Sequence, residues 1–214
     1  MIRLLNVISS LNNAGTEKVV MNYLRNMDHS QIVQDFLVLD MGDGYYEEEI
    51  KQYGGQIYKI PSFMQAPIAN LKARRKFFKE HRYDIVEVHS PAVNRYGYCK
   101  EAKKAGSIAI FHLHNTNLPK GLLGAYCLRQ VRKYSDQIVS CSKKAAEVSL
   151  RGICDKVIPN AINFDDYKFD EQKREKIRAE LDIEENIKVI GHVGRFSLEK
   201  NQIFLMRAFG KAAE

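Results

Sequence analysis

Short apolar runs alternate with helical patterns from the first residues of the chain to about residue 158. The apolar runs have the length of buried strands and fall at 2–8, 35–39, 56–60, 84–89, 108–112, 137–141 and 156–158. Most of the intervals carry helical spacing, at 16–27, 46–53, 70–80, 94–104, 121–134 and 143–150. Strands that alternate with helices pair in parallel, and their crossovers are right-handed. The sequence therefore predicts an α/β fold with a doubly wound parallel sheet.

Length and composition indicate one such domain and a remainder. The chain has 214 residues, of which 45% are hydrophobic and 28% charged, as in ordinary soluble proteins. A charged stretch after residue 163 predicts a boundary, with a domain at 1–163, a linker containing a helix at 164–186, and the start of a second domain at 187–214. The four scattered cysteines indicate reduced thiols and a cytoplasmic protein.

The net charge of +7 and the isoelectric point near 9.1 indicate an anionic partner. Much of the excess lies at 72–82, where a helix would carry Arg74, Arg75 and Lys79 beside or opposite its apolar side. A solvated helix face and a surface that meets acidic lipid headgroups both fit this pattern. No motif for reading bases accompanies it, so nucleic acid is not expected as a partner.

Residues 191–201 (GHVGRFSLEKN) have the pattern of a receptor for a diphosphate. An apolar strand at 187–193 leads into a turn with Arg195, and a helix opens near Lys200. Helix N-termini and basic side chains together bind phosphate groups. We expect this strand and helix to begin a second domain, because a unit of this size cannot bury its own apolar face.

The first predicted strand ends in a polar loop, Ser9 to Glu17, that leads into a helix. Ligands of open α/β sheets bind at such carboxyl ends. The loop lacks Gly-x-Gly-x-x-Gly and the Gly-Lys-Ser/Thr ending, so neither a dinucleotide fingerprint nor a P-loop is present. Asn13, Gly15 and Thr16 could approach a sugar or phosphate, or could form a simple turn with Thr16 near the cap.

Histidines follow two further strands. His112 and His114 are two residues apart, and His89 ends a neighbouring predicted strand. A three-histidine metal site is conceivable, but no carboxylate or cysteine pattern completes it. We therefore expect no metal, with one histidine acting as a hydrogen-bond donor or proton relay and the others structural. Ser142 is an expected N-cap, and no Gly-x-Ser-x-Gly elbow indicates a serine hydrolase.

Together these segments resemble family 4 glycosyltransferases of the GT-B fold, especially bacterial enzymes of capsular and exopolysaccharide synthesis. The resemblance covers essentially the whole chain, with each segment weakly specific alone. The matching segments are AGTE at 14–17, VVMNYLRN at 19–26, DFLV at 35–38, YYEEEI at 45–50, GGQIY at 54–58, YDIVEVH at 83–89, HLHNT at 112–116, PNAI at 159–162, and Gly194-Arg195 through Lys200-Asn201.

The resemblance implies two facing Rossmann-like domains, an N-terminal one for the acceptor and a C-terminal one for a nucleotide-activated sugar. Arg195 and Lys200 would bind the donor diphosphate and stabilise the leaving nucleotide. The Gly15 loop would face the donor phosphates, and His114 would contact the transferred sugar. The transfer would retain the anomeric configuration, need no cofactor or metal, and use a nucleotide-sugar, most simply a UDP-sugar. Candidates for acceptor contact are Asn13, Gly15, Thr16, His89 and Asn115.

The sequence departs from the family pattern in three places. Ala14 and Ala161 stand where glycine is usual, and the Glu-x7-Glu motif of the donor site is absent. We therefore expect an acceptor-binding half that transfers no sugar alone. A non-catalytic binding module and a nucleotide-sugar epimerase of similar architecture are the alternatives. The basic segment 72–82 favours a lipid-linked saccharide acceptor and a peripheral site at the inner face of the membrane.

Overall fold

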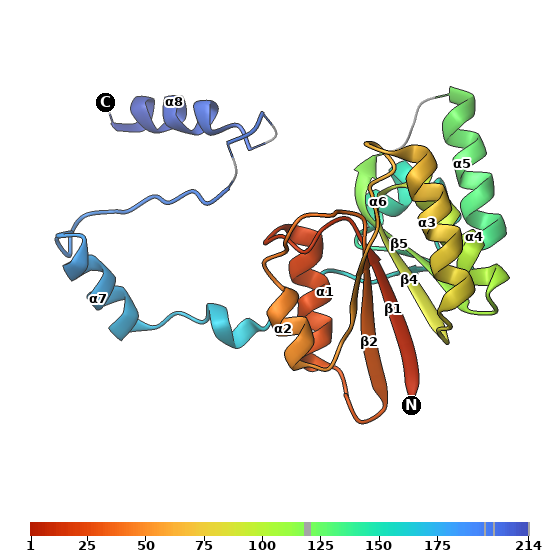
Figure 1. Cartoon of the computed structure of the whole chain (residues 1–214). Helices are drawn as coiled ribbons and strands as arrows, with labels where there is room; N and C mark the ends of the chain where they lie inside the picture. The colour runs from red at the N-terminus through yellow and green to blue at the C-terminus, as the bar shows by residue number, and fades with distance from the viewer. Residues whose placement is uncertain (118–120, 195, 199, 214) are drawn as a thin grey trace. The chain divides into compact units, whose positions relative to one another are not determined.

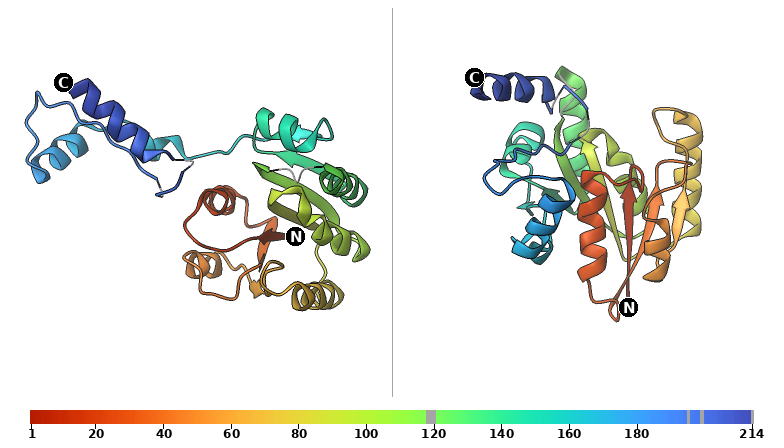
Figure 2. Two further views of the ribbon diagram at one scale, coloured as in Figure 1. Left: turned by 90° about the horizontal axis from the view of Figure 1, so that it is seen from above. Right: turned by 90° about the vertical axis from the view of Figure 1, so that its left-hand side faces the viewer.

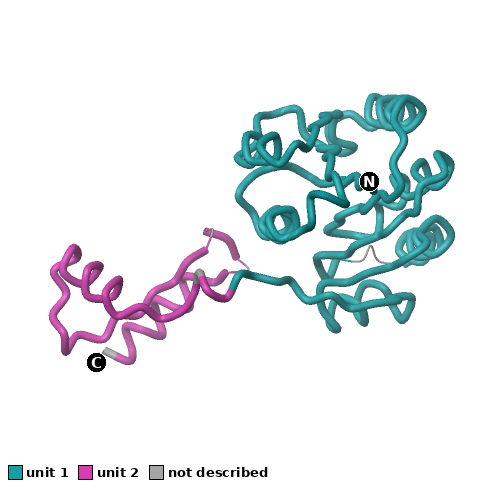
Figure 3. The backbone as a smooth tube through the Cα atoms, turned by 90° about the horizontal axis from the view of Figure 1, so that it is seen from below, with its two compact units in different colours: residues 1–163 teal, residues 164–214 magenta. Residues whose placement is uncertain are grey.

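The computed structural model describes residues 1–117, 121–194, 196–198 and 200–213. The chain divides into two compact units, residues 1–163 and 164–214 (Figure 3). The first contains the whole sheet, and the second contains helices and extended chain.

Unit 1 is built on a seven-stranded sheet in the order β3-β2-β1-β4-β5-β6-β7, and every neighbouring pair is parallel. The strands are β1 (Ile2–Ile8), β2 (Ile32–Val38), β3 (Ile57–Lys59), β4 (Ile85–Ala92), β5 (Ile108–Asn117), β6 (Gln137–Ser140) and β7 (Lys156–Val157). The order runs outward from β1 in both directions, which is the topology of a doubly wound sheet. The predicted fold class is confirmed.

Helices cover both faces of the sheet (Figures 1 and 2). The helices of unit 1 are α1 (Gly15–Asn26), α2 (Glu47–Gln52), α3 (Pro67–Glu80), α4 (Tyr96–Lys104), α5 (Gly121–Tyr134) and the short α6 (Lys143–Ala145), with helical turns η1 (Val93–Arg95) and η2 (Ala146–Leu150). Helices α1 and α2 lie on one face, and α3, α4 and α5 on the other (Figure 1). Among the helices described, none combines the length and the apolar run that crossing a bilayer requires.

The alternation of side chains along each strand builds two cores. In β1, Leu5 and Val7 point to the α3–α5 face and join the larger buried cluster with Phe78 of α3. Ile8 points the other way and packs with Leu24 of α1 in the smaller cluster. Both faces of the central strands are therefore buried, as the continuous apolar runs predict.

Strand β5 is the main departure from the expected boundaries. It continues to Asn117, five residues past the expected end, although residues 115–117 are polar and exposed. Backbone pairing sustains the extension, because Ala92 of β4 is in register with Asn117 across an irregularity. Hydrophobicity alone could not predict this pairing. As a result, His114 and Asn115 stand on a strand and not in a loop.

Ser142 caps α6 as expected, with its Oγ accepting from the amide of Ala145 at 3.1 Å. The helix predicted at 143–150 is nevertheless divided, since α6 passes into the π-helical turn η2. The turn ends at Arg151, which has a left-handed φ of 46°. The helix predicted at 94–104 likewise begins as η1 before α4.

Unit 2 contains η3 (Phe164–Tyr167), α7 (Glu171–Glu180) and α8 (Gln202–Ala213). The strand predicted at 187–193 was wrong, because these residues form no regular structure. Apolar side chains of this stretch, such as Ile190 and Val193, are exposed. A strand needs a neighbour to satisfy its backbone groups, and the described residues of unit 2 supply none.

Asp35 links its own strand β2 to β1 and to the segments that lead into β3 and β4. It is 2% exposed. Its Oδ2 accepts hydrogen bonds from Tyr83 Oη at 2.8 Å and Arg3 Nη2 at 3.1 Å, and its Oδ1 accepts from the Gln56 amide at 2.8 Å. Burial, and then the bond to Asp35, raise the pKa of Tyr83 far above its usual range. Tyr83 is thus held as a neutral donor.

Replacing Asp35 by alanine should lower the free energy of unfolding by about 3 kcal/mol, because the buried Tyr83 hydroxyl, the Gln56 amide and the Arg3 guanidinium all lose their acceptor. Urea denaturation followed by circular dichroism measures this loss. The matched control is Asp43→Ala, which removes an exposed carboxylate 3.5 Å from Lys59 and should cost less than about 1 kcal/mol. Equal losses in the two variants would contradict the role given to Asp35.

Candidate functional site

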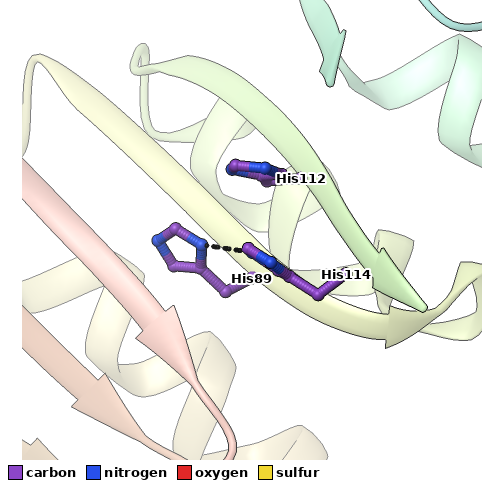
Figure 4. A group of neighbouring side chains, drawn as sticks. All are labelled: His89, His112 and His114. Carbon is purple, nitrogen blue, oxygen red and sulfur yellow. Dashed lines mark hydrogen bonds between the residues drawn. The ribbon is translucent and has the colours of Figure 1, made fainter. Parts of the chain in front are cut away.

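The register of β1, β4 and β5 gathers polar side chains on one face of the sheet. Asn6 is paired with Glu87, and His89 is paired with His112. Since alternate residues of a strand share a face, Glu87 lies beside His89 and His112 beside His114. Figure 4 shows the three imidazole rings together. The structure thus brings the three predicted histidines into one cluster.

A chain of hydrogen bonds orients two of these rings. Asn6 Nδ2 donates to Gln34 Oε1 at 2.9 Å, so Asn6 Oδ1 is left as the acceptor for His89 Nε2 at 3.1 Å. His89 therefore carries its proton on Nε2 and accepts through Nδ1, which lies 3.0 Å from His114 Nε2. It follows that His114 is protonated on Nε2 and has its lone pair on Nδ1.

Glu87 orients the third ring. His112 Nδ1 donates to Glu87 Oε1 at 2.8 Å, and the ring stacks on His114 with centroids 4.1 Å apart. This leaves His112 Nε2 and His114 Nδ1 buried, with no hydrogen-bond partner among the described residues. Two imidazole lone pairs are therefore left without a hydrogen-bond donor among the described residues.

Burial keeps two of the imidazoles neutral. Desolvation lowers the pKa of His89 to about 4, against an opposing effect of Glu87. Desolvation, with His89 and His112 nearby, lowers the pKa of His114 to about 2. Desolvation by itself would raise the pKa of Glu87, but His89 and the hydrogen bond from His112 lower it. At neutral pH the cluster therefore contains an ionised carboxylate and a neutral His114 that can accept a hydrogen bond.

One ring nitrogen from each histidine lies within 4.8 Å of the others, a spacing that a metal ion could draw together. Both ring nitrogens of His89 are, however, already engaged by Asn6 and His114. A metal at the centre would have to displace the bond between His89 and His114. The expectation that the site needs no metal stays a prediction.

The loop after β1 lies at the same carboxyl edge of the sheet. Ala14 occupies the N-cap of α1 and offers no side-chain bond, so Thr16 lies in the first turn and is not the cap. Gly15 is exposed, and a Cβ added there would meet nothing within 4 Å. Asn13 Oδ1 accepts from Tyr46 Oη at 3.1 Å. The exposed Asn115 accepts from the Thr116 amide at 2.7 Å.

The predicted donor-site cations lie in unit 2 or outside the described residues. Lys200 is exposed in unit 2, and Arg195 lies outside the part of the chain that the structure describes. Their roles in binding a diphosphate therefore stay predictions.

The three predicted membrane-facing residues of α3 do not form one surface. Arg75 and Lys79 are exposed, one helical turn apart, and line an opening of about 330 Å³. Arg74 is rotated toward α4, where its guanidinium lies 4.9 Å from the centre of the Tyr98 ring. Arg74 points away from Arg75 because adjacent helix positions differ by about 100° in direction, and its contact with a membrane stays a prediction.

A second cavity, of about 340 Å³, lies at the carboxyl edge and was not predicted. It is lined by Leu39, Ser62, Phe63, Met64, Arg74, Pro91, Ala92, Asn94, Arg95, Tyr96, Gly97 and Tyr98. Arg95 Nη1 lies 3.5 Å from the carbonyl oxygen of His89, which connects the cavity to the histidine cluster. Burial lowers the pKa of Arg95, with Tyr98 and Glu17 opposing.

Sequence reasoning missed Asn6, Glu87 and Arg95 as members of the site. Asn6 and Glu87 were detectable as polar residues inside apolar strands, where burial requires a polar partner. Arg95 gave no such signal, because a basic residue in a connecting segment is ordinarily solvated.

Neutral, buried histidines make the stability of the chain dependent on pH. Because the folded pKa values of His89 and His114 lie below the usual 6.5, the unfolded chain takes up protons first, and the free energy of unfolding falls as the pH drops below 6.5, down to about 4 for His89 and about 2 for His114. As the pH falls from 6 to 5, each of these two histidines should lower the free energy of unfolding by up to about 1.4 kcal/mol.

Urea denaturation at pH 7.5, 6 and 5 measures this dependence. His114→Asn should reduce the slope, and His192→Asn, which replaces an exposed ring in unit 2, should leave it unchanged. The same slope in His114→Asn as in the unaltered chain would show that His114 is not held neutral by the fold.

The family model Glycosyltransferase Family 4 matches residues 14–166. The chain is 27% identical to the Bacillus subtilis (strain 168) protein "Putative glycosyltransferase EpsF", with 96% of the chain and 57% of that protein covered. Two crystal structures of Anabaena HepE, with UDP and glucose and with UDP, match with TM-scores of 0.74 and 0.71, at 16% and 17% identity. They cover 99% and 98% of the chain, which spans 58% of each HepE chain.

The structural match agrees with the GT-B architecture expected from the sequence, and the chain spans little more than half the length of these relatives. The matched residues include helix α1 and the strands β2 to β7. Two of these strands, β4 and β5, carry the histidine cluster. The chain therefore belongs to Glycosyltransferase Family 4.

Proposed function

We propose that this chain is the acceptor-binding part of a retaining, nucleotide-sugar-dependent glycosyltransferase of cell-surface polysaccharide synthesis. The observation that carries the proposal is the buried histidine cluster, in which His114 Nδ1 has a free lone pair at the carboxyl edge of a family 4 sheet. Glycosyltransferase EpsF and the UDP-bound HepE structures are the relatives that support this reaction class.

His114 would act as a hydrogen-bond acceptor for a sugar hydroxyl. A neutral imidazole can accept through Nδ1 while its Nε2 remains fixed by His89. The ionised Glu87, through His112, adds negative potential behind this ring. Such a potential stabilises positive charge that develops on a sugar ring during transfer.

The donor diphosphate would lie against the Gly15 loop, where the first turn of α1 has no capping side chain. Arg195 and Lys200 would neutralise the leaving nucleotide. The HepE structures contain UDP, which supports a UDP-linked donor for this chain. The exposed Arg75 and Lys79 support a peripheral position at the cytoplasmic face of a membrane.

Saccharide binding by the 214-residue chain tests the acceptor assignment. Saturation-transfer NMR with lipid-linked or free oligosaccharides should detect binding, and His114→Asn should weaken it about tenfold, equivalent to about 1.4 kcal/mol for one hydrogen bond. His192→Asn is the matched control and should bind as the unaltered chain does.

The chain alone should transfer no sugar from UDP-glucose or other UDP-sugars, measured as released UDP. Efficient transfer, or tight binding of a UDP-sugar without saccharide binding, would contradict the assignment as an acceptor half. Saccharide binding in a longer polypeptide that never transfers sugar would favour a non-catalytic module instead.

A further inference from the structure

Two guanidinium groups line the cavity of about 340 Å³, and neither has a carboxylate partner among the described residues. Arg95 is half-buried, and its hydrogen bond in that part of the chain goes to the His89 carbonyl at 3.5 Å. A charge withdrawn from water is costly unless a counter-ion or several hydrogen bonds compensate it. Glu17 offsets the charge of Arg95 only electrostatically, and Arg95 forms no direct ion pair among the described residues.

Arg74 is held at the cavity by its surroundings. Its guanidinium lies over the Tyr98 ring at 4.9 Å, and its Nε is buried without a partner in the described residues. A Cβ added at Gly97 would stand 2.5 Å from Arg74 Nη1, so the guanidinium in this position packs directly on the glycine backbone. The packing thus places a second cation in the wall of the cavity.

The rest of the cavity wall is largely apolar. Leu39, Phe63, Met64 and Tyr96 line it, and Phe63 and Met64 are exposed at its rim. Two cations beside an exposed apolar rim suit an anion that is joined to a hydrocarbon chain.

The opening of about 330 Å³ beside Arg75 and Lys79 differs from this cavity in how its positive charge is balanced. The buried Glu101 in this opening lies 4.0 Å from Arg75 Nε and 3.5 Å from Lys104 Nζ. Its carboxylate therefore partly compensates the positive charge of these two side chains. A pair of arginines without a direct ion pair among the described residues therefore distinguishes the cavity of about 340 Å³ from this opening.

We propose that Arg74 and Arg95 bind the phosphate or diphosphate of a lipid-linked saccharide, with the lipid against Phe63 and Met64. The inference rests on the proposed function and names the class of its acceptor. Guanidinium groups bind phosphate oxygens in pairs, which favours arginine over lysine here. Because Arg95 contacts the His89 carbonyl, a sugar joined to this phosphate lies on the side of the histidine cluster.

Isothermal titration of the 214-residue chain with farnesyl diphosphate tests the proposal, with farnesol and inorganic pyrophosphate as comparison probes. Farnesyl diphosphate should bind at least tenfold more tightly than either. Arg74→Gln and Arg95→Gln should each weaken its binding at least tenfold, and Arg95→Lys should weaken it less than Arg95→Gln. The matched control Arg75→Gln, one residue along α3, should bind as the unaltered chain does.

Three results would overturn the proposal. Equal binding of farnesol would remove the role of the anion, and equal binding of pyrophosphate would identify a site for free phosphates. The third result has two parts: Arg75→Gln loses binding to phosphatidylglycerol vesicles, and Arg74→Gln and Arg95→Gln bind farnesyl diphosphate as the unaltered chain does. Together these outcomes would identify a membrane surface instead.

Thermal unfolding of the same variants separates binding from folding. Arg95→Gln should melt at about the same temperature as the unaltered chain, because Arg95 has no direct ion pair to lose among the described residues and its hydrogen bond to the His89 carbonyl is long, at 3.5 Å. A lower melting temperature would assign Arg95 a structural role and overturn its role as a ligand. Saccharide binding at His114 is read out separately, so failure here is distinct from failure of the proposed function.

Discussion

The parallel pairing of β4 with β5 is the constraint on which the site depends. The register that places His89 opposite His112 also sets Glu87 behind them and brings His114 within 3.0 Å of His89. A shift of one residue in either strand would turn these side chains into the α3–α5 core. Burial of Val88 and Phe111 on that face stabilises the register, so the apolar core determines where the polar cluster lies.

The polar groups inside this sheet follow a common rule. Asp35 has three donors, and Asn6, Glu87 and His89 each have a hydrogen-bond partner, so their burial is compensated within the domain. His112 Nε2 and His114 Nδ1 on β5 have no partner among the described residues. A substrate that donates hydrogen bonds to these two atoms would satisfy them.

Much of the fold could be predicted from local patterns. The strands from β1 to β7 and the α1–α5 helices were recognisable because apolar runs and helical spacing agree with the tertiary structure there. The end of β5 and the missing strand at 187–193 were not, since both depend on whether a neighbouring strand is present. Of the site, the histidines were predictable by type and spacing, whereas Arg95 was not, because its environment comes from segments distant in the sequence.

The sequence by itself determined the alternation of strands and helices, the family, and the presence of histidines at strand ends, because these are properties of neighbouring residues and short motifs. The tertiary structure alone decided the protonation of His89 and His114, the role of Glu87, and the turning of Arg74 away from Arg75 toward Tyr98. These depend on burial and on hydrogen-bond partners 25 to 83 residues away, as with His114 and Asn6 around His89. No local pattern encodes such partners, since they meet only when the strands pair.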